Sequence, residues 1–384
     1  MLISLLKKTL IIVPLLTVLL VACTQTYPTK QKATKMRTAK PMALLPRYRY
    51  DLALNRKEYD RTLHFIRSQL TGPYGINTNW KDSAQMATQA TGHEVLSESY
   101  GLMLESDALA GKKQAFKNDL ASLNRTMTLQ GGWSYRFSPK QNKKYPANAS
   151  VDDLRILLAI RMAAESFHQP EYKGLADKLG KRFVTHMLKK DKLVDFYDQQ
   201  LHTTNNRITL CYIRLRALNS LPINAERKKR VIRAMSAILH KGYLSDRLPF
   251  YQETYDYATK TYRSNTRINT IESLLTILNL SEQNREKAES IAFIKEKVKK
   301  GNLYNAYTKD GRTADSNQSA ANYALAAMIA ATIGDHAFYQ ASVKQMQKFE
   351  VLDKKSRFYG GFGDAESSDF YSYNNLTALL AYQY

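Results

Sequence analysis

Cysteine is almost absent from this chain of 384 residues, which contains only Cys23 and Cys211. If Cys23 carries a lipid, as argued below, the mature chain cannot form an internal disulfide. Cys211 lies in the apolar run Leu210-Cys211-Tyr212-Ile213, where a small, weakly polar side chain suits a core position. No histidine is placed to activate it, so we interpret Cys211 as a core residue and not as a nucleophile.

Paired metal-ligand spacing is also missing. The chain has seven histidines, and none of them pairs with another His or Cys at the short intervals that zinc sites use. We therefore expect them to be structural, and we expect neither a metal nor another cofactor. The histidines are at positions 64, 93, 168, 186, 202, 240 and 336.

Acidic residues are scarce relative to basic ones. The chain has 34 Asp and Glu against 57 Lys and Arg, which gives a formal net charge of +23. For a protein outside the cytoplasm, this charge favours anionic lipid head groups and anionic cell-wall polymers as partners, and not nucleic acid. Basic runs such as Arg227–Arg230 and Lys295–Lys300 are equally typical of solvated helix faces.

The first residues have the pattern of a targeting segment. Lys7 and Lys8 precede the apolar stretch Thr9–Val21, which ends at Ala22 and Cys23. This order matches a secretory signal peptide, and a small residue before cysteine is similar to a bacterial lipoprotein signal. The alternative is an uncleaved anchor, for which the run is short. We expect a signal peptide over residues 1–22 and a lipid on Cys23, which would hold the protein at the outer face of the bacterial membrane.

A polar, basic segment follows over residues 23–49. It has too few apolar residues to fold and reads as a flexible tether. Residues 50–384 are long enough for one large core, and we expect them to form a single catalytic domain that acts as a monomer.

After Asp51 the apolar residues recur at helical intervals, and one pattern repeats. A short aromatic extended piece is followed by a polar turn and then by an apolar helix. The expected helix starts are roughly 52 to 62 residues apart, near Glu98, Asp153, Arg207, Asn269, Ala321 and Asn375. Six helical hairpins at this period predict an all-α (α/α)6 toroid, with short aromatic β-hairpin inserts at its mouth. An open solenoid with the same period is the alternative.

Some helix bounds follow from the same pattern. Outer helices are expected over Tyr172–Leu188 and Ala225–His240, and an inner helix over Arg207–Leu218. The inner helices would all begin at one rim of the toroid, beside the aromatic inserts.

The chain contains 25 Tyr, and many of them lie in the aromatic pieces, which suits a carbohydrate cleft. Glycoside hydrolysis needs one protonated and one ionised carboxyl group. Glu98 starts an apolar helix beside Tyr100 and is the candidate acid, because partial burial raises a carboxyl pKa. Asp256, between Tyr255 and Tyr257, is the candidate base. In the simpler interpretation, Ser97 is only an N-cap and Glu98 a first-turn acid that complements the helix dipole.

At these residues the chain resembles glycoside hydrolase family 8. Ser97-Glu98-Ser99-Tyr100-Gly101 is similar to the family segment that carries the general acid. Ala149–Leu154 is similar to the segment whose second Asp, here Asp153, contacts the sugar. Tyr255–Thr259 is similar to the segment that holds the base, here Asp256. The chain departs from the family at Ser99, Tyr100 and Val151, and it lacks the Arg that follows the base. These departures indicate a divergent branch.

The resemblance implies an inverting endo-glycosidase that cuts a β-1,4-linked exopolysaccharide, trimming or releasing secreted or biofilm polymer. It implies Glu98 and Asp256 as catalytic residues. The expected substrate-binding residues are Asp153, Trp133, Tyr135, Arg136, Tyr255, Tyr100, Arg267 and Tyr373.

Two other functions are compatible with the sequence. A toroid that has lost turnover could serve polysaccharide export as a binding lipoprotein. A polysaccharide lyase on a similar toroid would need a Tyr/His or Arg/Tyr pair facing a uronic acid.

Overall fold

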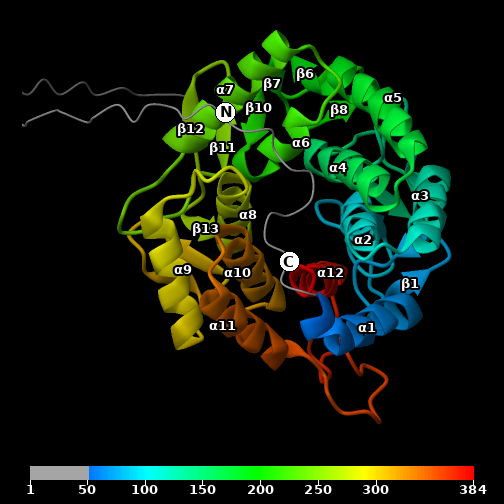
Figure 1. The fold of residues 1–384 in the computed structure, drawn as a ribbon, viewed down its shortest axis with the longest axis vertical. Helices are drawn as coiled ribbons and strands as arrows, with labels where there is room; N and C mark the ends of the chain where they lie inside the picture. The colour runs from blue at the N-terminus through cyan, green and yellow to red at the C-terminus, as the bar shows by residue number, and fades with distance from the viewer. Residues whose placement is uncertain (1–51) are drawn as a thin grey trace, which may run out of the picture. The chain divides into compact units, whose positions relative to one another are not determined.

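Six inner helices form a closed ring in the computed structural model, which describes residues 52–384 (Figure 1). Each inner helix contacts the next one along the chain, and the last contacts the first. This closure confirms the (α/α)6 toroid and excludes the open solenoid. The inner helices are α2 (Ser97–Leu109), α4 (Ser150–Ser166), α6 (Leu215–Asn219), α8 (Thr270–Ser281), α10 (Ala320–Ile333) and α12 (Ser372–Ala381).

Six outer helices surround this ring. Helix α7 shows why they lie outside, because its buried residues Val231, Met235 and Leu239 recur every four positions and form one apolar stripe. In α10, by contrast, all residues from Ala320 to Thr332 are buried. The outer helices are α1 (Arg56–Phe65), α3 (Lys113–Met127), α5 (Pro170–Met187), α7 (Ala225–Lys241), α9 (Ala288–Lys300) and α11 (His336–Met346).

Short helical turns complete the helical part. Within residues 52–384, a π-helical turn, η2 (Ile66–Leu70), extends α1, and there are three 3-10 turns, η1 (Leu52–Asn55), η3 (Leu210–Tyr212) and η4 (Gln347–Phe349). No helix among residues 52–384 is long and apolar enough to cross a membrane. The expected signal peptide, the lipidated Cys23 and the tether lie outside the described residues.

Small antiparallel sheets lie directly before the inner helices. Three of them have three strands, and they confirm the β-hairpin inserts predicted from the aromatic pieces. They are β3 (Val95–Leu96), β4 (Arg136–Ser138) and β5 (Lys143–Lys144); β10 (Arg207–Thr209), β11 (Thr254–Asp256) and β12 (Thr261–Arg263); and β13 (Arg267–Asn269), β14 (Ala306–Thr308) and β15 (Thr313–Asp315). Since β3 leads into α2, β10 into η3 and β13 into α8, the sheets line the rim where the inner helices begin.

Three two-stranded hairpins complete the strands. They are β1 (Thr71–Gly72) with β2 (Gly75–Ile76), β6 (Leu188–Lys189) with β7 (Lys192–Leu193), and β8 (Tyr197–Asp198) with β9 (Thr203–Thr204).

The inner helix predicted over Arg207–Leu218 is wrong in its first half. Residues 207–209 form β10, which pairs with β11 so that Ile208 lies opposite Tyr255. The Asp195 carboxylate accepts a 2.6 Å hydrogen bond from the Thr209 amide, which helps hold this segment extended. β-Branched residues favour a strand where a partner strand is available. The helix therefore starts only at Leu215, and η3 occupies the rim between α4 and α8, both of which it contacts.

Candidate active site

Glu98 is the second residue of α2, at the rim, and its side chain is half-buried. Burial and, to a smaller extent, the nearby charge of Asp152 raise the pKa of Glu98 to about 7, against the opposing effect of Arg155. No described residue donates a hydrogen bond to the Glu98 carboxyl group. A carboxyl group that is protonated near neutral pH and has no internal partner can transfer its proton to a ligand.

Asp152 and Arg155 form a fixed ion pair beside Glu98. The Arg155 guanidinium donates to Asp152 Oδ1 at 2.9 Å, and Ser97 Oγ donates to Asp152 Oδ2 at 2.7 Å. Both charged side chains are about 5% exposed. The sequence prediction missed this pair because it assigned the site to the next residue, Asp153. The spacing of three residues between Asp152 and Arg155 on a helix was the available signal.

Asp153 and Trp133 point into the protein and not into an open cleft. Each is 1% exposed, and the Trp133 amide donates to Asp153 Oδ1 at 3.2 Å. Asn148 Nδ2 donates to Asp153 Oδ2 at 2.5 Å, and burial raises the pKa of Asp153 to about 7. The backbone packs so closely here that a Cβ on Gly132 would collide with Asp153 Oδ2. Internal partners therefore occupy the polar groups of Asp153, and both side chains are buried, which argues against the expectation that Asp153 and Trp133 contact substrate.

Arg136 and Tyr100 are also held internally. Arg136 is 1% exposed, and it donates to both carboxylate oxygens of Glu94 at 2.8 and 2.7 Å. The Tyr100 hydroxyl donates to the Tyr74 carbonyl oxygen at 2.7 Å and contacts Ser122 on the outer helix α3. We therefore do not retain either residue as a substrate contact, because neither presents a free polar group to the rim.

The remaining expected binding residues do lie at the rim. Tyr135 packs edge-on against Tyr145, with ring centroids 5.5 Å apart. Tyr255 packs against Tyr262 at 4.8 Å in the β11–β12 hairpin. Arg267 is exposed and forms a 2.9 Å ion pair with Asp315 across the sheet of β13, β14 and β15. These side chains keep exposed surface that a ligand could contact.

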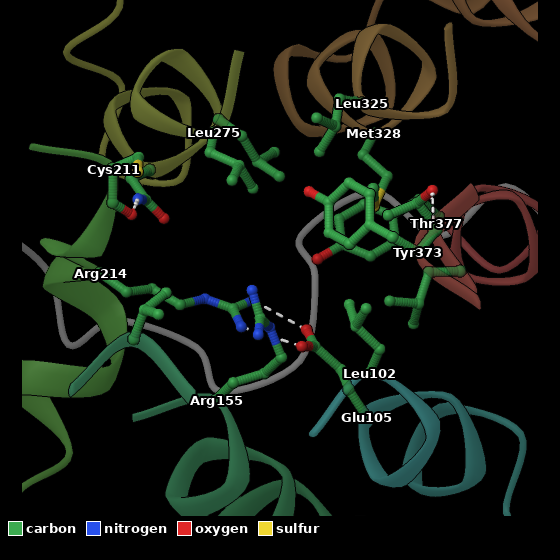
Figure 2. A pocket seen from close by; sticks show the side chains of 15 residues that line it. Leu102, Glu105, Arg155, Cys211, Arg214, Leu275, Leu325, Met328, Tyr373 and Thr377 are labelled. Carbon is green, nitrogen blue, oxygen red and sulfur yellow. Dashed lines mark hydrogen bonds and ion pairs between the residues drawn. The ribbon is translucent and has the colours of Figure 1, made fainter. Parts of the chain in front are cut away.

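Tyr373 lies in the first turn of α12, and its aromatic side chain points into the cavity enclosed by the inner helices (Figure 2). Its hydroxyl oxygen is buried, and no described residue hydrogen-bonds to it. Burial and the charge of Glu98 both raise the Tyr373 pKa, so the hydroxyl keeps its proton and faces the same charge environment as Glu98. Tyr373 therefore offers a donor beside the candidate acid.

Asp256 lies at the end of β11, at the turn that leads into β12. Its Oδ1 accepts hydrogen bonds from the amides of Ala258 at 2.9 Å and Thr259 at 3.0 Å, so it stabilises its own hairpin turn. These hydrogen bonds lower the pKa of Asp256 and keep it ionised. No described contact joins Asp256 to Glu98 or to the Asp152–Arg155 pair.

A small cavity lies inside the ring, between Arg155, Tyr373 and the buried pair of Glu105 and Arg214 (Figure 2). Arg214 donates to both oxygens of Glu105 at 2.9 and 2.8 Å. The cavity volume is about 40 Å³, which suits a few water molecules, since one water needs on the order of 10–15 Å³ of such volume. The cavity is therefore too small to hold a sugar ring.

A second acidic group was not predicted from the sequence. Glu272 lies in the first turn of α8, and burial raises its pKa to about 7, with further contributions from Glu253 and Asp195. The feature that could have pointed to Glu272 is its position in the first turn of an inner helix, which it shares with Glu98. Within residues 52–384 there is no group of three or more His, Cys, Asp or Glu side chains arranged to hold a metal ion.

Comparison with known proteins gives relatives of similar length. No family model matches the chain. The Bacillus subtilis (strain 168) protein named "Putative lipoprotein YdaJ" is 28% identical over 292 residues, which cover 74% of this chain and 78% of that protein. A solved structure described as a novel alpha-amylase from Clostridium perfringens is 29% identical, with a TM-score of 0.78, and the match covers 85% of this chain and 97% of that one.

More distant solved structures share the fold. The endo-beta-1,4-glucanase CMCax from Acetobacter xylinum has a TM-score of 0.57 at 16% identity, over 75% of this chain and 96% of that one. The family 8 endoglucanase Cel10 from Klebsiella pneumoniae has a TM-score of 0.56 at 14% identity, over 76% and 97%. These TM-scores confirm, for the fold, the resemblance that the sequence showed. The chain therefore has the (α/α)6 toroid of family 8 glycoside hydrolases, in a divergent form.

Proposed function

We propose that this protein is a glycoside hydrolase that cuts a polysaccharide at the rim of the toroid, with Glu98 as the general acid. The observation that carries the proposal is the Glu98 carboxyl group, which has a pKa of about 7, no internal hydrogen bond, and a fixed ion pair beside it. Solved structures of the same fold that are described as glycosidases support this reaction class.

The chemistry follows from the arrangement around Glu98. Its proton passes to the glycosidic oxygen as the bond to the anomeric carbon breaks, and a carboxylate takes a proton from the attacking water. The Asp152–Arg155 pair fixes the charge environment in which Glu98 titrates. Asp256, the base expected from the sequence, is ionised and at the rim, but its carboxylate already accepts two amide hydrogen bonds.

The finer features of the proposal concern substrate and location. We propose inverting, endo-acting cleavage of a β-1,4-linked exopolysaccharide by an enzyme anchored through Cys23 outside the cytoplasm. The lipoprotein named as a relative supports the anchor, and the net charge of +23 supports contact with anionic wall polymers. An α-1,4-glucan is the second candidate substrate, because the solved structure with 29% identity is described as an alpha-amylase.

The test is the release of reducing ends from a panel of polymers: carboxymethyl-cellulose, chitosan, xylan, soluble starch and exopolysaccharide from the native host. We expect wild type to cut one of them and Glu98→Gln to release almost nothing. Binding without release would favour the accessory-lipoprotein alternative. Products that absorb in the near ultraviolet would indicate an unsaturated sugar and therefore a lyase.

A further inference from the structure

We infer that Glu272 is the general base of this enzyme, the residue that takes the proton from the attacking water; this inference rests on the proposed glycosidase function. Glu272 and Glu98 occupy equivalent positions, because each lies in the first turn of an inner helix. The inner helices begin at one rim, so both carboxyl groups are presented to the same mouth. This juxtaposition is what a two-carboxylate hydrolase requires.

The other carboxyl groups near the rim are already held by hydrogen bonds. Asp195 accepts from the Thr209 amide at 2.6 Å and from Asn205 Nδ2 at 2.8 Å. Glu253 accepts from the Asn265 amide at 3.0 Å, and Asp152, Asp153 and Asp256 have the partners described above. For Glu272, as for Glu98, no described residue donates a hydrogen bond or forms an ion pair with the carboxyl group. A base needs a lone pair that is free to accept a proton. Both carboxylate oxygens of Glu272 offer one, whereas Asp256 and Glu253 each offer only the oxygen that accepts no amide hydrogen bond.

The turn η3 lies near both Glu98 and Glu272. It packs against α4 on one side and α8 on the other. Besides burial, the charges of Asp152 and Glu98 raise the pKa of Tyr212 on η3. Besides burial, the charge of Glu272 raises the pKa of Cys211 on η3, while Arg155 lowers it. In the order of the inner helices, α2 with Glu98 and α8 with Glu272 stand opposite each other across the ring, with α4 and η3 between them on one side. A sugar bound over the mouth would therefore lie between the two carboxyl groups.

The surroundings of Glu272 also suit a base. Asp195 and Glu253 are the charged groups that face it, and both favour its protonated form. A carboxylate surrounded by negative charge binds a proton more tightly than an isolated one. In the proposed step, the oxygen of water bonds to the anomeric carbon as the glycosidic bond breaks. Glu272 receives the proton of this water, and Glu98 gives its proton to the leaving oxygen.

Azide rescue tests the assignment. Glu272→Ala removes the base and leaves a space in which azide can attack the anomeric carbon without a base. On the polymer that wild type cuts fastest in the panel above, we expect kcat to fall by at least about 100-fold. Added sodium azide should reverse a large part of this loss and give a glycosyl azide detectable by mass spectrometry.

Three further variants make the result decisive. Glu226→Gln changes an exposed first-turn Glu on the outer helix α7 and should leave kcat unchanged. Glu272→Gln keeps the side-chain shape and should lose activity without rescue, with an unchanged circular dichroism spectrum. If Asp256→Ala loses activity and azide rescues it while Glu272→Ala stays active, the base is Asp256 and the inference is overturned. If wild type cuts no polymer, the proposed function itself has failed.

Discussion

Glu98→Gln is expected to lower kcat on the natural polymer by roughly a thousandfold. The reason is that a glutamine has no proton to give to the glycosidic oxygen, and general acid catalysis contributes about 10²–10⁴ to such rates. The defect should shrink on a 2,4-dinitrophenyl glycoside, because this leaving group departs without protonation. Steady-state kinetics on the two substrates measure the difference.

The same variant should not lose stability. Burial gives Glu98 a pKa of about 7 in the folded protein, above its ordinary value of 4.5. The folded state therefore binds this proton more tightly than the unfolded state, and the charged carboxylate destabilises the fold once the pH rises through 7. In mildly alkaline buffer, the neutral amide introduced by Glu98→Gln should leave Tm unchanged or higher. An equal loss of activity on both substrates, or a large fall in Tm, would mean that Glu98 has a structural role only.

Arg136→Met is expected to lower the free energy of unfolding by about 3–5 kcal/mol, the usual effect of breaking a buried ion pair. Arg136 is buried and bonded to both oxygens of Glu94, and its Nη2 donates to the Met86 carbonyl oxygen at 2.5 Å. Removing the guanidinium leaves the Glu94 carboxylate buried without this partner. Urea unfolding followed by circular dichroism measures the change.

A double variant is the control for this prediction. Glu94→Gln combined with Arg136→Met removes both charges, so its loss should be clearly smaller than that of Arg136→Met alone. If Arg136→Met loses less than about 1 kcal/mol and instead raises KM strongly, then Arg136 is the substrate contact expected from the sequence and not a structural residue.

The six helical hairpins could be predicted from the sequence because hairpin period is a property of spacing alone. Closure into a ring needed the contact between the first and last inner helices, which an open solenoid with the same period lacks. Inner helices such as α4 and α10 begin within about three residues of the positions that the repeat indicated. The helix start predicted at Arg207 is wrong because Ile208 and Thr209 pair with a strand far along the chain, at residues 254–256. Local periodicity contains no information about that pairing.

The candidate site was harder to predict, because a linear motif does not state which way a side chain points. Glu98 could be proposed from the sequence because it lies both at an expected helix start and in a family-like segment. Asp153 also belongs to a family-like segment, and Arg136 was expected to bind substrate, yet Asn148 and Glu94 hold them inside the protein. Glu272 belongs to no family-like segment, and its surroundings come from distant parts of the chain.

The measurement that tests the central claim most directly is the pH dependence of kcat/KM for the wild-type enzyme, which reports the pKa values of the free enzyme. Glu98 is faced by Asp152 and Arg155 on α4, Tyr212 on η3 and Tyr373 on α12. Its pKa of about 7 predicts that kcat/KM falls as the pH rises above 7, because the acid loses its proton.

The acid side of the same profile distinguishes the two candidate bases. Glu272, with a pKa of about 7, predicts a fall below pH 7 and hence a narrow bell centred near neutrality. Asp256, whose pKa is lowered from its ordinary value of 3.8, would predict no such fall until the pH is below that ordinary value. A fall above neutral pH that disappears in Glu98→Gln supports the account. A rate that stays constant from mildly acidic to clearly alkaline pH would contradict Glu98 as the acid.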